Sequence, residues 1–188
     1  MNPKDIKKKF LLAKVKKGIT AWHIAALNGN LEAFEKLWFW AKETELNPDV
    51  MLLAHTDGGF TVLHIAAHEN HVNILKKIWI CAEECQVNPK DLKIKLLLAK
   101  NYQEITAWHI AAINGNLEAF ESLCVFAKET GLNPDDMLLA QTEGGFTVLH
   151  MAAYGNHMDI LQKMWVWAED CQRNPKKLKR KLLLAKEK

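Results

Sequence analysis

Long apolar runs, a disulfide framework and a secretory leader are all missing from this sequence. No apolar stretch approaches the roughly 18–20 residues that a membrane-spanning helix requires. The basic N-terminus, MNPKDIKKKF, is not followed by the apolar segment and small-residue cleavage site of a signal peptide. Four cysteines are present, without the regular spacing of a disulfide scaffold: Cys81, Cys85, Cys124 and Cys171. We therefore expect an intracellular, cytoplasmic protein, which means the host cytosol if the source is a symbiont or a virus.

Motifs of nucleotide-binding and hydrolytic enzymes are also missing. The sequence contains no G-x-x-x-x-G-K-[ST], G-x-G-x-x-G or G-x-S-x-G. Its glycine pairs, DGGF at 57–60 and EGGF at 143–146, are turn signals. A nucleophilic cysteine needs a base as partner. No base pairs legibly with Cys81 or Cys85, which we interpret as small buried hydrophobic residues. We expect no enzymatic activity, no cofactor and no small-molecule substrate.

A histidine cluster is the strongest candidate for a metal site. His64, His68 and His71 follow the spacing H-x3-H-x2-H. The segment HENH differs from the zinc motif H-E-x-x-H, because its second histidine comes one residue too early to share a helix face. The internal duplicate described below carries Tyr154 in place of His68, so a ligand set would not survive the duplication. We expect no metal ion.

Charge is distributed unevenly over an otherwise globular composition. The chain has 188 residues, 49% hydrophobic and 25% charged, with a formal net charge of +3. Residues 1–18 hold seven lysines against one aspartate, and residues 171–188 hold eight Lys/Arg against one glutamate. The ends therefore carry about +6 and +7, and residues 19–170 carry about −10. The net charge of the whole chain is positive, although its central segment, the acidic body of residues 19–170, is negative.

Four near-identical phrases reveal an internal repeat, which is the first feature to establish in any such chain. They are TAWHIAALNGN from Thr20, TVLHIAAHENH from Thr61, TAWHIAAINGN from Thr106 and TVLHMAAYGNH from Thr147. Their spacings are 41, 45 and 41 residues, so the true period is a pair of units spanning 86 residues. Residues 2–87 and 88–173 are identical at 59 of 86 positions, which indicates a recent duplication.

Each unit is predicted to form a helix pair and a short extra helix. The threonine is an N-cap before a short apolar helix, and Asn28-Gly29 or its counterparts end that helix. A second helix such as LEAFEKLWFWAKE carries apolar residues every three or four positions. Asn-Pro at 47, 88, 133 and 174 then signals a third helix, with Asn as N-cap and Pro at its first position. Strand-like alternation is absent, so the fold class is all-α.

Such short helices cannot bury their apolar faces alone and must stack on their neighbours as a solenoid. The third-helix phrase NPKDIKKKFLLAK opens the chain and returns as NPKDLKIKLLLAK and NPKKLKRKLLLAK. We therefore expect a slice of a longer array, forming one solenoid over residues 1–188. Residues 1–14 would end a preceding repeat, and four repeats would follow: 15–55, 56–100, 101–141 and 142–186.

The tryptophans suggest two environments. Trp38 and Trp79 lie on the apolar stripe of the second helix, where core packing is expected. Trp40 and Trp167 project elsewhere, and we expect them to cover the LLLA of the third helix. An exposed pair would instead mark a contact patch.

The phrase T-x-x-H-x-A-A, followed by a turn and L-E-x-x-x-x-L, resembles the ankyrin repeat over nearly the whole chain. The resemblance implies a projecting β-turn finger before each threonine, with glycine two residues ahead of it, and a T-x-x-H histidine that hydrogen-bonds within and between repeats. Gly18, Gly59 and Gly145 occupy the glycine position, and Glu104 replaces it. Units of 41–45 residues exceed the family's usual length of about 33.

By the same resemblance, the chain is expected to bind another protein through finger tips and first helices. Differences between the two halves form three clusters, and two of them fall there: VKKG at 15–18 became NYQE at 101–104, and HE at 68–69 became YG at 154–155; the third is WFW at 38–40, which became CVF. Relaxed drift of a mobile loop would produce the first of these too. We expect a monomeric, non-catalytic scaffold. The candidate partner-binding residues are Lys16, Lys17, Ile19, Asp57, Phe60, His68, Tyr102, Gln103, Ile105, Glu143, Phe146 and Tyr154.

The alternative is an electropositive surface that binds nucleic acid or an acidic membrane. Basic residues recur on the third helix once per 86 residues, and a positive stripe can hold phosphates. The residues are Lys7, Lys8, Lys9, Lys93, Lys95, Lys177, Lys179, Arg180 and Lys181. A solvated helix face explains them equally well, and the acidic body disfavours phosphate binding. A structural spacer without a partner is the remaining class.

Overall fold

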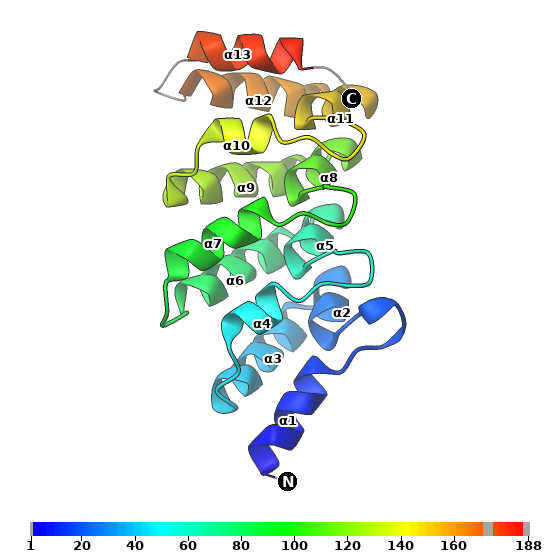
Figure 1. The fold of residues 1–188 in the computed structure, drawn as a ribbon, viewed down its shortest axis with the longest axis vertical. Helices are drawn as coiled ribbons and strands as arrows, with labels where there is room; N and C mark the ends of the chain where they lie inside the picture. Colours follow the sequence, from blue (N-terminus) through cyan, green and yellow to red (C-terminus); the bar gives the residue numbers. More distant parts are fainter. Residues whose placement is uncertain (1, 171–174, 186–188) are drawn as a thin grey trace.

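A computed structural model describes residues 2–170 and 175–185 of the chain. Helices stack in sequence order along the longest axis, from α1 at one end to α13 at the other (Figure 1). Within those two ranges the secondary structure is helical, without a strand. The predicted all-α helical repeat solenoid is therefore confirmed.

Helix pairs form the body of the stack. The first and second helices are α2 (Ala21–Leu27) and α3 (Leu31–Glu43), α5 (Val62–His68) and α6 (Val72–Glu83), α8 (Ala107–Asn114) and α9 (Leu117–Thr130), and α11 (Val148–Tyr154) and α12 (Met158–Asp170). First helices pack on first helices and second on second, as α5 does on α8 and α6 on α9. The chain thus buries its apolar faces between consecutive pairs, as the repeat pattern predicts.

Third helices follow the second helices and alternate in length. The long ones are α1 (Pro3–Leu12), α7 (Pro89–Leu98) and α13 (Pro175–Leu184), and the short ones are α4 (Pro48–Leu52) and α10 (Pro134–Leu138). Each begins at the proline of an Asn-Pro pair, as predicted, because proline lacks only an N–H that a helix start leaves unbonded.

The asparagines before these prolines do not all act alike. Asn47 accepts a hydrogen bond from Asp49 N at 2.9 Å, and Asn133 accepts one from Asp135 N at 3.2 Å. Asn88 differs, because its backbone is left-handed, with φ 56° and ψ 59°. The predicted N-cap geometry is confirmed at 47 and 133 and is wrong at 88. Asn174 lies outside the described residues.

The core follows the aromatic positions of the helix pairs. Trp22 and Trp108 are fully buried and meet Phe34 and Phe120 edge to face, with ring centroids 5.4 and 5.6 Å apart. Such contacts add to the area that large aromatic rings bury. The predicted core placement of Trp38 and Trp79 is confirmed, since both are buried.

Trp40 and Trp167, which were predicted to cover the third helix, lie in different surroundings. Trp167 is buried and stacks on Trp108 of the neighbouring pair, with centroids 5.6 Å apart. Trp40 leaves 43% of its surface exposed at the α1 end of the stack. The two indoles stand at different positions of the duplicated unit, so they have different neighbours.

Candidate partner-binding surface

Each helix pair is preceded by a tight turn, which we name a finger. The fingers span residues 15–19, 56–60, 101–105 and 142–146, and each is closed by two main-chain hydrogen bonds. In the finger at 101–105, Asn101 N donates to Ile105 O at 2.9 Å and Glu104 N donates to Asn101 O at 3.0 Å. The other fingers repeat these two bonds, but Lys17, the third residue of the finger at 15–19, has a left-handed backbone with φ 66°, whereas its counterparts Gly58, Gln103 and Gly144 do not.

The fourth residue of every finger has a left-handed backbone. Gly18, Gly59 and Gly145 have φ values of 70°, 82° and 83°, which glycine adopts at little cost. Glu104 holds φ 60° at the same place, and its carboxylate pairs with Lys100 at 2.5 Å. The finger therefore keeps its geometry without glycine, at the expense of local strain.

Main-chain hydrogen bonds also join each finger to the next. Asp57 N donates to Lys17 O at 2.8 Å, and Glu143 N donates to Gln103 O at 2.9 Å. Between them Tyr102 N donates to the Gly58 carbonyl at 3.4 Å. The fingers thus form one hydrogen-bonded row, and a row cross-linked in this way holds its side chains at fixed spacing.

The T-x-x-H histidines hydrogen-bond to the main chain next to the fingers. His64 Nδ1 lies 3.2 Å from Thr61 N, which donates to it, and its Nε2 lies 3.1 Å from the Ile105 carbonyl of the following finger. Because Nδ1 accepts, the proton is on Nε2. Burial lowers the pKa of His64 to about 4, and burial likewise lowers the pKa of His109 to about 4. Both rings are therefore neutral: His64 links its repeat to the next, and His109 Nε2 lies 3.0 Å from the Ala140 carbonyl of its own repeat.

The predicted partner-binding residues divide into exposed and half-buried sets. Among the exposed ones, Tyr102 and Tyr154 leave 66% and 82% of their surface open. Phe60 and Phe146 are half-buried, because each ring packs edge-on against the histidine of its own repeat. The remaining exposed residues are Lys16, Lys17, Asp57, His68, Gln103 and Glu143, and Ile19 and Ile105 are half-buried.

One residue of this surface was not anticipated. His55 is exposed beside Tyr102, with ring centroids 5.9 Å apart and the phenolic oxygen 3.5 Å from Nδ1. Its carbonyl accepts a hydrogen bond from Lys14 Nζ at 3.2 Å. The available signal was the duplicate, which carries Gln141 at this position. His55 extends the exposed surface from one finger toward the next.

Comparison with known families decides what this arrangement is. A family model of ankyrin repeats in three copies matches residues 2–91, and a second, of ankyrin repeats in many copies, matches residues 109–164. The chain belongs to the ankyrin-repeat family. Ankyrin repeats are generally protein–protein interaction modules and are typically non-catalytic. No curated protein matched the sequence.

Four of the nine basic residues on which the electropositive alternative rests form ion pairs in this ankyrin solenoid. Lys93 is buried to 9% exposure over the Trp79 ring and pairs with Glu83. Lys95 pairs with Asp91 at 2.7 Å. On α13, Lys179 pairs with Glu169 and Lys181 with Asp135, and on α1 Lys4 pairs with Glu45. Part of the stripe, on α7 and α13, is thus paired with carboxylates of the acidic body.

The histidines and cysteines that could bind a metal are engaged separately. His64 anchors a finger, His68 contacts Glu69 at 2.8 Å, and His71 Nε2 lies 3.1 Å from the Leu27 carbonyl. Across residues 2–170 and 175–185, no three His, Cys, Asp or Glu side chains are grouped as metal ligands. Burial raises the pKa of the Cys81 thiol to about 12, as expected of an unreactive buried residue. Cys171 lies outside the described residues.

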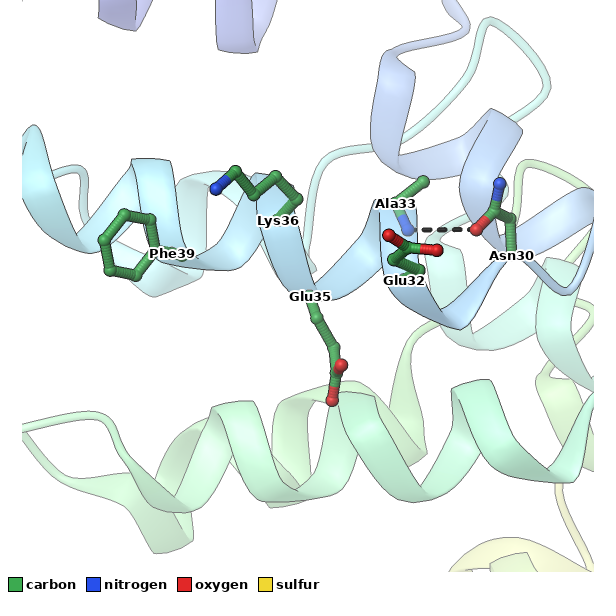
Figure 2. Close-up of a pocket in the computed structure, with 6 residues that line it drawn as sticks. All are labelled: Asn30, Glu32, Ala33, Glu35, Lys36 and Phe39. Carbon is green, nitrogen blue, oxygen red and sulfur yellow. Dashed lines mark hydrogen bonds between the residues drawn. The ribbon is translucent and has the colours of Figure 1, made fainter.

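A shallow depression lies along one side of α3, apart from the fingers. Figure 2 shows Lys36, Phe39 and Asn30 lining it, with Glu35 directed toward α6, where it pairs with Lys77 at 2.9 Å. The depression belongs to the end of the ankyrin stack.

No helix in the described part of the chain is long and apolar enough to cross a membrane.

Proposed function

We propose that this ankyrin solenoid is a non-catalytic scaffold that binds a partner protein through its fingers and the ends of its first helices. The observation that carries the proposal is the hydrogen-bonded row of fingers, in which Asp57 and Tyr102 bond to the finger before them. A surface that is already ordered loses little conformational entropy on binding. The row therefore supports recognition by side chains held at fixed positions.

Chemistry along the row differs between the two halves of the chain. The first finger presents Lys16 and Lys17, and the third presents Tyr102, Gln103 and the Glu104–Lys100 pair. Tyrosine is among the residues that dominate the binding energy of interfaces. We infer that the first finger favours an acidic segment of the partner, and that Tyr102 and Tyr154 supply the aromatic anchors.

The half-buried residues have a smaller part in this proposal. Phe60 and Phe146 pack on the structural histidines, so their substitution would disturb the fold as well as the surface. Ile19 and Ile105 are half-buried as well, and we retain them as contacts at the rim of the surface.

The repeat boundaries 15–55, 56–100, 101–141 and 142–186 have one finger at the start of each unit. Three buried cysteines outside any disulfide support a reducing, cytoplasmic location.

The test is capture of partners from a lysate at two salt concentrations, with the products identified by mass spectrometry. The finger variant carries Lys16→Ala, Lys17→Ala, Tyr102→Ala and Tyr154→Ala. Its control carries two lysine and two apolar substitutions on exposed parts of other helices: Lys76→Ala, Lys90→Ala, Ile80→Ala and Val125→Ala. Circular dichroism verifies that both stay folded.

The proposal predicts a partner that resists salt, is lost with the finger variant and is kept by the control. A partner kept by the finger variant and released by salt would contradict it. That result would assign binding to the lysines of the third helices, because phosphate-driven binding weakens steeply with ionic strength. Equal recovery by all three proteins at both salt concentrations would also contradict it.

A further inference from the structure

The interface between the pairs α5–α6 and α8–α9 occurs once in the described chain, but both of its halves occur twice. Because residues 2–87 and 88–173 are duplicates, α2–α3 repeats the sequence of α8–α9, and α11–α12 repeats that of α5–α6. These repeated halves lie at the two ends of the stack (Figure 1). Each end can therefore be compared with a covered counterpart in the same molecule.

The end of the stack formed by α2 and α3, which we name the N-end face, is open where its counterpart is covered. Ile24 and Trp40 are 42% and 43% exposed, whereas their counterparts Ile110 and Phe126 are 6% and 5% exposed. The depression of Figure 2 lies on this face, since Ala33 lines it and the counterpart Ala119 is fully buried.

The other end, formed by α11 and α12, is the C-end face, and it is open in the same way. Trp165 is 39% exposed, whereas its counterpart Trp79 is 6% exposed. Ala153 is exposed, and its counterpart Ala67 is fully buried. The ends expose apolar surface that the interior of the stack covers.

Polar contacts across the covered interface define what each face recognises. The Trp79 and Phe126 rings stack with centroids 4.3 Å apart, and the Trp79 indole N–H donates to Glu129. Asn70 Nδ2 donates to Glu118 Oε2 at 2.7 Å, and Asn116 Nδ2 donates to the Ala67 carbonyl at 2.8 Å. His64 contributes the finger contact described above.

Every side chain that makes these polar contacts is conserved in kind at the ends. On the C-end face the counterparts of Trp79, Asn70 and His64 are Trp165, Asn156 and His150, and on the N-end face those of Glu129, Glu118 and Asn116 are Glu43, Glu32 and Asn30. Phe126 is replaced by Trp40, which keeps an aromatic ring, and Lys36, which lines the depression, stands where the covered interface has Ser122. At present Asn30 accepts a hydrogen bond from its own helix, from Ala33 N at 2.9 Å (Figure 2).

We propose that the C-end face of one copy of this chain docks on the N-end face of a second copy, reproducing the α5–α6/α8–α9 interface between molecules. The occupant of each face is thus another copy, in head-to-tail order. Such an interface joins two different patches, so it leaves one free face at each end and can extend into chains. This departs from the monomer expected from the sequence.

Docking requires one rearrangement, because α1 and α13 are both counterparts of α7. Within the chain α7 packs on both α6 and α9, whereas α1 packs on α3 and α13 on α12. At the junction α13 of one copy would replace α1 of the next and bury Leu183 and Leu184, which are each 64% exposed. The displaced α1 loses the burial of Leu11 and an exposed ion pair, Lys4–Glu45, which is weak.

The experiment is sedimentation velocity on complementary variants. Ala33→Arg places a long charged side chain on the N-end face, and Ala153→Arg does so on the C-end face. Both alanines are at least partly open in a single copy, so both variants are expected to fold. Val125→Arg, on an exposed site of α9 that no junction covers, is the control.

The wild type and the control should show a mean mass that rises with concentration above the 21.5 kDa of one chain. Each arginine variant alone should remain at 21.5 kDa. An equimolar mixture should form a complex of twice that mass, because it contains one intact face of each kind. A wild type that stays at one chain's mass, or a mixture that does, would overturn the proposal.

Discussion

Acid should destabilise the solenoid between pH 6.5 and pH 5 through its T-x-x-H histidines. His64 Nδ1 accepts from Thr61 N, and its Nε2 faces the Ile105 carbonyl. A proton added to Nδ1 would face the Thr61 N–H, which is also a donor, inside a buried site. Protonation therefore removes a hydrogen bond and buries a charge, and the same holds for His109.

The size of the effect follows from the pKa values. Burial lowers the pKa of both His64 and His109 from 6.5 to about 4, so the unfolded chain binds these protons at higher pH than the folded one. The stabilisation is complete above pH 6.5 and is lost as the pH falls toward 4. At about 1.4 kcal/mol per pKa unit, each histidine contributes on the order of 3 kcal/mol.

The assay is urea unfolding at half-unit steps from pH 7.5 to pH 5. Near pH 5.5 the free energy of unfolding should fall by at least about 2 kcal/mol per pH unit, since His64 and His109 each take up a proton on unfolding and burial also lowers the pKa of His23. His64→Gln should be less stable at pH 7.5, and its slope should be smaller by the contribution of one proton, about 1.4 kcal/mol per pH unit. His68→Gln, at an exposed site on the same helix, is the control for the substitution itself.

A flat curve between pH 6.5 and pH 5 would refute this reasoning. So would a His64→Gln slope equal to that of the wild type, because the buried ring would then not be the group that titrates. The glutamates whose pKa is lowered by lysine or asparagine hydrogen bonds, such as Glu84, act mainly below this window and do not confuse the comparison.

Three further substitutions, two of them paired with an exposed control, test the packing account by chemical unfolding. Glu104→Gly removes a left-handed non-glycine backbone and should raise the free energy of unfolding by about 0.5–1 kcal/mol; a loss of stability would contradict the strain argument. Lys93→Ala should cost about 1–2 kcal/mol, because its stem and charge are buried, while Lys95→Ala, exposed on the same helix, should cost under about 0.5 kcal/mol. Leu96→Ala should cost about 2–5 kcal/mol as a fully buried core residue, and its exposed counterpart Phe10→Ala under about 0.5 kcal/mol; equal costs would deny that α1 and α7 differ in burial.

Features governed by local chemistry could be predicted from the sequence. Thr61 and His64 form the capping box that the repeat phrase implies, and helices begin at Pro48 and Pro89. These signals are local because a helix start is decided by the few residues around it. The fold class, the family and the core placement of Trp79 followed from the period and the apolar spacing.

Features governed by neighbours in space could not be predicted. Asn47 and Asn88 both precede proline, yet Asn47 is extended and Asn88 left-handed, because the connection from the second helix differs. Trp40 is exposed because no helix pair of the described chain covers this end of the stack. The spacing of apolar residues within α3 gives no information about such neighbours. Phe60 was expected to face a partner, but its ring packs on the histidine four residues later, a rotamer that the motif does not specify.

Site-specific photo-crosslinking would test the central claim most directly. A photoreactive phenylalanine at position 102 or 154 would sample the fingers and first-helix ends, and the same group at position 80 or 125 would sample exposed sites on second helices. The account predicts a crosslinked partner protein from positions 102 and 154, which mass spectrometry identifies, and none from positions 80 and 125. Adducts from 80 or 125 without any from 102 and 154 would contradict it.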